Sequence, residues 1–229
     1  MIDHWWTTRP KRKLITIVDT LRIFTAVAEG QRWRGNRDLH LRFEGALEQE
    51  EIKRAGERRD QQAGGGRTYA AWLYSFGLWF DDTDGLARLT FAGEDLVKGE
   101  APVPIMTKQV LDFQYPSPFS HITRVNPRYR LFPFRFLLKL ILHRRLDGTL
   151  SKKEIARFAI TKASTDNDLD EVAQTILTYR NSGEDDAVFD GTFEDAFGKI
   201  SELEDVANTF INQLEFTQLI ERIAGSDRI

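Results

Sequence analysis

Residues 67–99, RTYAAWLYSFGLWFDDTDGLARLTFAGEDLVKG, contain the stretch that decides the fold of this 229-residue chain. Its first part, 67–76, places apolar side chains at helical spacing, and a glycine follows as a stop. The runs 78–80 and 87–89 are short and extended in character, and Asp84-Gly85 between them is a strong hairpin signal. The stretch therefore predicts a helix followed by a two-stranded hairpin.

The segments on either side of this stretch are also predicted to be helical. Thr90 follows the hairpin and is expected to cap a helix over 91–98. Upstream, apolar residues at helical spacing predict a helix over 15–29, and Asn36 or Asp38 can cap a second one. Three helices, a two-stranded wing and a further helix follow one another in the order of a winged helix-turn-helix.

Between the second and third helices, residues 55–66 are polar, charged and glycine-rich, which predicts an exposed loop. Gly64-Gly65-Gly66 lacks the Gly-Lys-Ser/Thr ending of a phosphate loop. We expect it to be a flexible approach to the helix that begins at Arg67. The N-terminus of such a helix can meet a DNA phosphate.

The second half of the chain predicts further helices. Pro133 suits the first turn of a long helix, and Ser151 with Glu154 forms a capping box. The expected helices span 107–113, 133–145, 152–160, 168–179, 192–200 and 203–223. Five prolines make the surroundings of the first of these loop-rich.

We therefore expect a mainly α fold with two winged-helix or helix-turn-helix subdomains, a small β-hairpin wing and additional C-terminal helices. The expected parts are a first winged-helix subdomain with an N-terminal basic arm (1–100), a loop-rich connector (101–128), a second helix-turn-helix subdomain (129–183) and an acidic helical segment or linker (184–229).

The formal net charge of −3 conceals an uneven distribution. Residues 1–80 carry 14 Lys or Arg and 10 Asp or Glu, and residues 81–160 carry 13 and 9. Residues 161–229 carry 5 and 16. This asymmetry fits a polyanion-binding body with an acidic appendage, and it equally fits two solvated surfaces of opposite sign.

Residue usage also bears on the compartment. The chain contains no cysteine, which excludes disulfides, thiolate chemistry and cysteine metal sites. No window approaches eighteen uncharged apolar residues, and the N-terminus has no apolar core of a signal peptide. We expect no membrane segment and a cytoplasmic location.

Catalytic motifs are weak throughout. The four histidines lack the spacing of a helical zinc site, and no Gly-x-Ser-x-Gly motif is present. Glu51-Ile52-Lys53 formally matches the carboxylate-x-lysine pair of a magnesium-dependent nuclease, but it follows a polar helical stretch and no strand. We interpret it as a solvated helix face, and we expect no catalytic residue, metal site or cofactor in this chain.

Cations interleaved with aromatic residues are the recurring theme. Arginine reads guanine, asparagine and glutamine read adenine, and lysine anchors phosphates, so this pattern indicates DNA binding. We interpret Trp5, Trp33 and Trp72 as core anchors. The candidate DNA-contacting residues are Arg9, Lys11, Arg12, Lys13, Arg32, Arg34, Arg67, Thr68, Tyr69, Lys108, Gln109, Gln114, Arg124, Asn126 and Arg128.

Several of these residues lie in segments that resemble one known family. The segments are WTTRPKRK (6–13), GQRWRG (30–35), LTFAGE (89–94), Lys108-Gln109, FQYPSP (113–118), PFRFLL (133–138), LSKKEIA (150–156) and YRN (179–181). In this order, over about residues 5 to 181, they resemble the AlwI-type family of type IIS restriction endonucleases, which includes large subunits of nicking endonucleases. The wing region is also similar in plan to the first recognition subdomain of FokI.

The resemblance implies an N-terminal recognition region built of winged-helix subdomains, followed by a separate nuclease domain that uses magnesium. Such enzymes read a short asymmetric site and cut at a fixed distance to one side. We expect this chain to depart from the pattern by ending where the recognition region ends. We therefore expect a module that binds double-stranded DNA, with the nuclease on a missing domain or another subunit.

Two other functions stay open at this point. A stand-alone winged-helix regulator would dimerise and bind a palindrome, because two-fold protein symmetry imposes two-fold site symmetry. A small complete nuclease would cleave DNA with magnesium and depend on Glu51 and Lys53.

Overall fold

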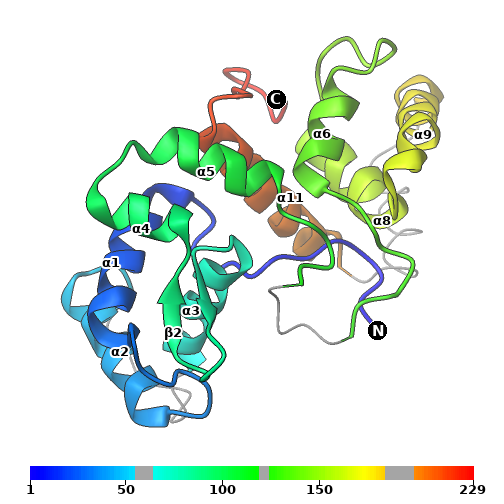
Figure 1. The fold of residues 1–229 in the computed structure, drawn as a ribbon. Helices are drawn as coiled ribbons and strands as arrows, with labels where there is room; N and C mark the ends of the chain where they lie inside the picture. Colours follow the sequence, from blue (N-terminus) through cyan, green and yellow to red (C-terminus); the bar gives the residue numbers. More distant parts are fainter. Residues whose placement is uncertain (55–63, 119–123, 184–198) are drawn as a thin grey trace. The chain divides into compact units, whose positions relative to one another are not determined.

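The computed structural model describes residues 1–54, 64–118, 124–183 and 199–229 (Figure 1). These residues are mainly helical, and the sheet among them is a two-stranded antiparallel hairpin. They divide into two compact units. The N-terminal unit comprises Thr8–Gln109, and the C-terminal unit comprises Met1–Thr7, Val110–Pro118 and the described part of Ile122–Ile229.

The N-terminal unit is built from helices that begin and end where the capping residues indicate. Asn36 caps the second helix by accepting a hydrogen bond from the Leu39 amide at 3.1 Å, which decides between the two expected caps. Thr90 caps the fourth by accepting from the Gly93 amide at 3.2 Å. The elements are the 3-10 turn η1 (Leu14–Thr16), α1 (Ile17–Ala28), α2 (Arg37–Gln49), α3 (Gly64–Ser75) and α4 (Phe91–Lys98).

The predicted hairpin is confirmed. Strands β1 (Trp79–Asp81) and β2 (Ala87–Leu89) pair antiparallel, with Phe80 opposite Arg88. The carboxylate of Asp82 closes the turn, because its Oδ1 accepts hydrogen bonds from the amides of Asp84 (3.0 Å) and Leu86 (2.8 Å). Side chains alternate across the pleat, so Trp79 and Ala87 are buried while Phe80 and Arg88 face solvent.

An aromatic cluster forms the core of this unit. The Phe24 ring lies 4.7 Å from the Trp79 ring, 5.1 Å from the Trp33 ring and 5.3 Å from the Phe43 ring, measured between centroids. These rings come from α1, α2, the loop between them and β1, so the cluster joins the hairpin to the helices. Trp33 and Trp72 are buried, as their interpretation as core anchors requires.

The C-terminal unit contains a second set of helices. The expected capping box is present: Ser151 Oγ accepts from the Glu154 amide at 3.1 Å, and Glu154 Oε2 accepts from the Ser151 amide at 2.8 Å. The elements are α6 (Pro133–Ile141), α7 (Lys152–Glu154), the π-helical turn η2 (Ile155–Ala159), α8 (Ile160–Lys162), the 3-10 turn η3 (Asp166–Asp168), α9 (Leu169–Ser182) and α11 (Ile200–Phe216).

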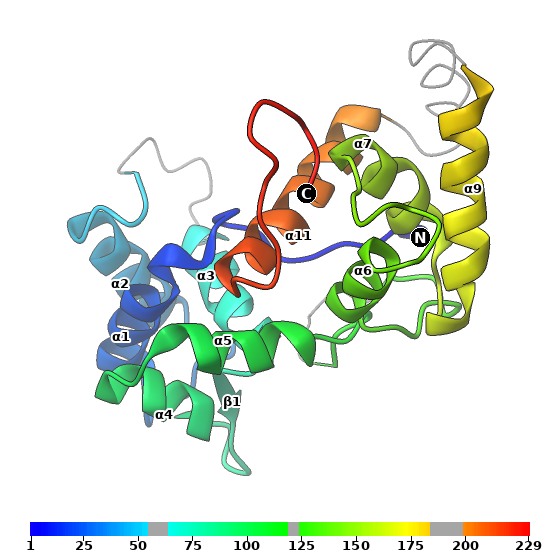
Figure 2. The ribbon, with the colours of Figure 1, turned by 90° about the horizontal axis from the view of Figure 1, so that it is seen from above.

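Trp5 explains why the first seven residues belong to the C-terminal unit. Its side chain is fully buried, with ring centroids 5.6 Å from Phe136 of α6 and 5.7 Å from Phe210 of α11. Its indole N–H donates to the Ala163 carbonyl at 2.6 Å. Figure 2 shows this N-terminal segment passing beside α11. The expected boundaries had assigned residues 1–100 to one subdomain.

Three expected element bounds are wrong. The helix expected over 107–113 is α5 (Pro102–Leu111), which begins earlier and places its prolines in the first turn, where a missing N–H costs nothing. Helix α6 ends at Ile141 and not near Arg145. Helix α11 ends at Phe216 and not at Ile223, since Gln218 adopts a positive φ of 63°.

Two further expectations concern segments that lie wholly or partly outside the described residues. Most of the expected loop 55–66 lies outside the described residues, but Gly64–Gly66 are described and are helical, so this part of the expectation is wrong. The expected helix over 192–200 also lies outside the described residues except at its last two positions.

The last residues of the chain pair with the segment before α7, where Leu150 and Ile229 exchange backbone hydrogen bonds of 3.1 and 2.9 Å.

Candidate nucleic-acid interface

Helix α3 buries one face and exposes the other. Arg67 and Thr68 are exposed, whereas Tyr69 is only 5% exposed. The Tyr69 hydroxyl donates to the Ile52 carbonyl at 3.4 Å, and burial raises the pKa of this phenol. Because Tyr69 faces the core, we leave it out of the candidate interface, which keeps Arg67 and Thr68.

The glycines that begin α3 mount this helix closely on α2. A Cβ at Gly65 would lie 2.5 Å from Glu44 Oε1, and a Cβ at Gly66 would lie 2.6 Å from the His40 carbonyl oxygen. Glycine is therefore needed here for close packing between two helices. The start of α3 therefore packs directly on α2, and the expectation that the three glycines form a flexible approach to this helix is wrong.

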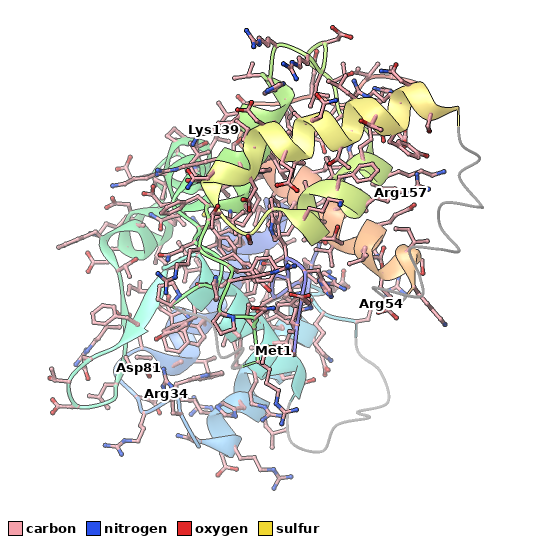
Figure 3. All side chains as sticks on the ribbon, turned by 90° about the vertical axis from the view of Figure 1, so that its right-hand side faces the viewer. Met1, Arg34, Arg54, Asp81, Lys139 and Arg157 are labelled. Atoms are coloured by element: carbon pink, nitrogen blue, oxygen red, sulfur yellow. The ribbon has the colours of Figure 1, made fainter. Side chains whose placement is uncertain are left out.

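Arg34 lies next to this face and is held by the hairpin. Its Nε donates to Asp81 Oδ2 at 2.8 Å, and its guanidinium carbon lies 5.9 Å from the centre of the Tyr74 ring of α3. The hydrogen bond with Asp81 is the main reason that the pKa of Arg34 is raised. Figure 3 shows Arg34 and Asp81 beside one another. Sequence reasoning selected Arg34 but missed Asp81 and Tyr74 as its partners.

The outer face of the hairpin carries a second arginine, which sequence reasoning missed. Arg88 is exposed opposite Phe80, and its Nε donates to Asp82 Oδ2 at 2.9 Å. Arg32, which was expected, donates from Nη2 to the Asp84 carbonyl at 3.1 Å. The strand alternation around position 88 would have placed Arg88 on the solvent face.

The basic arm lies at the start of the N-terminal unit. Arg12 and Lys13 are exposed, and Arg9 and Lys11 are half-buried. Lys13 immediately precedes η1, so the arm leads directly into α1. All four cations lie where water reaches at least part of the side chain.

Lys108 and Gln109 lie at a groove near the end of the same unit. The groove has a volume of about 490 Å³, and Thr90, Phe91 and Ile105 also line it. Phe91 is 88% exposed, although it occupies the first position of α4. The groove therefore combines an exposed aromatic ring with one cation, Lys108, and one anion, Asp95.

The remaining sequence candidates belong to the C-terminal unit. Gln114 and Arg124 are exposed. Arg128 donates to the Tyr129 hydroxyl (3.0 Å) and the Thr161 carbonyl (3.2 Å), and its Nε lies 3.2 Å from Asp3 Oδ1. Asn126 donates to the same Asp3 oxygen at 2.8 Å. Arg128 and Asn126 thus hold the N-terminal segment within the fold.

A second group of cations in the C-terminal unit was missed altogether. Lys153, Arg157, Arg180 and Arg228 line a polar groove of about 660 Å³ with Glu154 and Asp227. Arg157 is fully buried, donates to the Tyr179 hydroxyl at 2.5 Å and lies near α9 in Figure 3. The sequence shows these cations scattered over separate segments, so spacing could not group them.

Lys53 of the formal nuclease motif takes part in ion pairs within the fold. Lys53 Nζ lies 3.0 Å from Glu44 Oε1 and 2.7 Å from Glu48 Oε1, so it links the two acids of α2. Among the residues that the structure describes, no group of three or more His, Cys, Asp or Glu could hold a metal ion.

One comparison with known proteins gives a match. Residues 97–201, less than half of the chain, match the N-terminal domain of the type II restriction endonuclease HgaI. The match supports an N-terminal region like that of a type IIS restriction enzyme, and it is not specific for the AlwI-type family. None of the curated proteins matches the chain. Within the described ranges, no helix is long and apolar enough to cross a bilayer.

Proposed function

We propose that this chain is the sequence-specific recognition part of a type IIS restriction or nicking endonuclease. It binds double-stranded DNA and reads a short asymmetric site. The observation that carries the proposal is the match of residues 97–201 to the N-terminal domain of HgaI. The ordered motifs shared with the AlwI-type family support the narrower assignment to that family, and the cytoplasm is the compartment in which such an enzyme meets its DNA.

The surface that we propose for DNA binding lies in the N-terminal unit, of which residues 97–109 fall within the match. Its helices and hairpin follow one another in the order of a winged helix-turn-helix, with α3 in the place of the recognition helix. Arg67 and Thr68 on the exposed face of α3 read bases in the major groove, and Arg34 contacts Tyr74 towards the other end of the same helix. The cations of the basic arm bind the phosphate backbone or a neighbouring groove.

The chemistry of cleavage belongs elsewhere in this proposal. A type II nuclease uses Mg²⁺ to activate water and to stabilise the leaving oxygen. Lys53 of the formal nuclease motif is paired with Glu44 and Glu48 of α2. We therefore propose that the magnesium-dependent nuclease is a separate domain or subunit that acts together with this chain.

Selection of binding sites from a random duplex library tests the proposal. The purified chain is expected to enrich a short asymmetric sequence and to leave it uncut when Mg²⁺ is added. Six to ten phosphate contacts give a log–log salt slope of roughly −5 to −9. Enrichment of a palindrome would instead indicate a dimeric regulator, cutting would indicate a complete nuclease, and no enrichment would contradict sequence-specific recognition.

Two variants separate base reading from backbone binding. Arg67→Ala is expected to weaken the selected site by about 1–3 kcal/mol and to relax its sequence preference. Lys11→Ala is expected to weaken all duplexes alike. Lys98→Ala is the control, because Lys98 is an exposed cation paired with Glu94 on α4 and is not a candidate contact. Equal behaviour of all three variants would contradict the assignment.

A further inference from the structure

We infer that Asp81 is a positioning residue, which orients Arg34 so that its guanidinium reads a guanine base. The inference rests on the proposed function and goes beyond it by naming a base, a specificity determinant and the residue that holds it. An acidic residue on a DNA-facing surface otherwise only repels phosphates. The geometry around Asp81 points to a different role.

The contact between Asp81 and Arg34 leaves the far end of the guanidinium available. Asp81 Oδ2 binds the Nε of Arg34 at 2.8 Å, and the Tyr74 hydroxyl lies 3.4 Å from Nη2. Asp81 uses the Nε–H, and Tyr74 uses one N–H of Nη2. Neither partner uses Nη1 or the second N–H of Nη2, and the side chain is 57% exposed. That pair of donors matches the O6 and N7 acceptors of guanine.

The support beneath Arg34 restricts how the guanidinium can turn. The Tyr74 ring lies under it, with 5.9 Å between the guanidinium carbon and the ring centre. Tyr74 projects from α3, and Asp81 ends β1, so two elements of the same unit hold this one side chain. An arginine that only neutralises phosphates does not need such a fixed orientation, because a phosphate can be approached from many directions.

The second oxygen of Asp81 provides an independent observation. Asp81 Oδ1 is buried and has no hydrogen-bond partner among the residues that the structure describes. A buried carboxylate oxygen without a partner lowers stability, so it calls for an explanation outside folding. Orientation of Arg34 supplies one, since the carboxylate is retained at a cost to stability for the one contact that it makes.

The test depends on the sign of the change in DNA affinity that Asp81→Ala causes, because a repelling charge and a positioning residue predict opposite signs. Asp81→Ala removes a negative charge, and electrostatics alone would strengthen binding to every duplex. If Asp81 positions Arg34, the selected site instead loses about 10-fold or more, which is the discrimination expected of one bidentate arginine–guanine contact. Asp84→Ala is the matched control, because it removes the same charge from the exposed turn without touching Arg34.

The full chain is titrated with the selected duplex, with variants changed at each guanine, and with a random duplex. The expected result is that Asp81→Ala loses preference at one guanine and binds random duplex at least as well as the parent, while Asp84→Ala keeps the preference. Arg34→Lys retains the charge but not the fork, so it is expected to lose the same guanine. The double variant loses no more than either single one.

Each contrary result is distinct. Stronger binding of Asp81→Ala to all duplexes, as for Asp84→Ala, would reduce Asp81 to a repelling charge. Equal weakening on all duplexes would make Arg34 a phosphate contact, and either result overturns the inference while leaving the proposed function intact. Failure of the parent chain to prefer any site overturns the proposed function itself. If Asp81→Ala does not fold by circular dichroism, Arg34→Lys decides, and a retained guanine preference contradicts the inference.

Discussion

In the N-terminal unit, Arg34 and Arg88 each bind one aspartate of the hairpin and keep 57% and 46% of the side chain exposed, whereas in the C-terminal unit Arg157 and Arg180 lie inside the fold. Arg180 illustrates the second kind. It binds both oxygens of Glu154 at 2.6 and 2.9 Å and donates to the carbonyls of Thr149 (2.8 Å) and Leu146 (3.2 Å).

The difference teaches that the position of cations along a sequence does not locate a DNA-binding surface. The first two thirds of the chain are uniformly basic, yet they include Arg128, which binds the N-terminal segment, as well as Arg34, which faces solvent. What separates them is the number of N–H groups that the fold already uses. An arginine whose donors all meet carbonyls and carboxylates contributes to folding, and one with free donors at its end can bind a ligand.

The largest predicted effect concerns Arg180. Arg180→Ala leaves the Glu154 carboxylate, only 4% exposed, without its cationic partner. We expect the free energy of unfolding of the C-terminal unit to fall by about 3–5 kcal/mol, as when one partner of a buried ion pair is removed. Hydrogen exchange of the α7 and α9 amides measures this loss. Affinity of the folded variant for DNA should not change, and a large loss of affinity without loss of protection would contradict the comparison.

The hairpin and the capping residues were predictable because they are local. Asp84-Gly85, Thr90 and the Ser151–Glu154 box act over a few residues, and the structure confirms each. Burial of the tryptophans was also predictable from their size. The expected sheet and helical content followed from the same short-range patterns.

The long-range features were not predictable. Nothing near Trp5 indicates that its partners are Phe136 and Phe210, more than a hundred residues away. The contact of Asp81 with Arg34 likewise joins residues 47 positions apart. Such pairs depend on how helices pack, which a single sequence does not encode locally. The DNA contacts stay predictions. The structure reduces the set of candidate residues, because Tyr69 is buried and Arg128 donates to the Thr161 carbonyl within the fold.

A second prediction tests the close packing of α3 against α2. Gly66→Ala places a Cβ 2.6 Å from the His40 carbonyl, so α3 must shift away from α2. We expect the free energy of unfolding of the N-terminal unit to fall by about 1–3 kcal/mol, and DNA preference to weaken with it. Gly45→Ala is the control, since nothing lies within 4 Å of its Cβ and alanine favours the helix by about 0.5–1 kcal/mol. Equal effects of both changes on unfolding would refute close packing.

The third prediction compares an arginine from each unit directly. Arg128→Ala removes two hydrogen bonds and an ion pair with Asp3, which is expected to cost about 1 kcal/mol because the side chain is partly exposed. It should leave the salt dependence of DNA binding unchanged. Arg88→Ala should hardly alter stability but should reduce the log–log salt slope by about one. Salt titrations of both variants measure these slopes. A reduced slope for Arg128→Ala together with an unchanged slope for Arg88→Ala would contradict the comparison.

The smallest predicted effect is a pH dependence reported by His40. Burial lowers the pKa of this imidazole, and the nearby charge of Arg67 lowers it further, against the hydrogen bond between Nε2 and the Trp33 carbonyl. The unfolded chain therefore takes up the proton first. The stability that depends on neutral His40 is complete above about pH 6.5 and declines as the pH falls from there toward the folded pKa.

Arg67→Ala should bring the pKa of His40 closer to its ordinary value of 6.5 and thereby reduce this decline. Nuclear magnetic resonance titration of the His40 ring in the parent and in the variant measures the change, with Lys98→Ala as the control, because Lys98 is not among the groups that shift this pKa. DNA phosphates bound beside Arg67 should raise the same pKa, since they offset its charge. A His40 titration that neither Arg67→Ala nor a saturating duplex alters would place the bound DNA away from the start of α3.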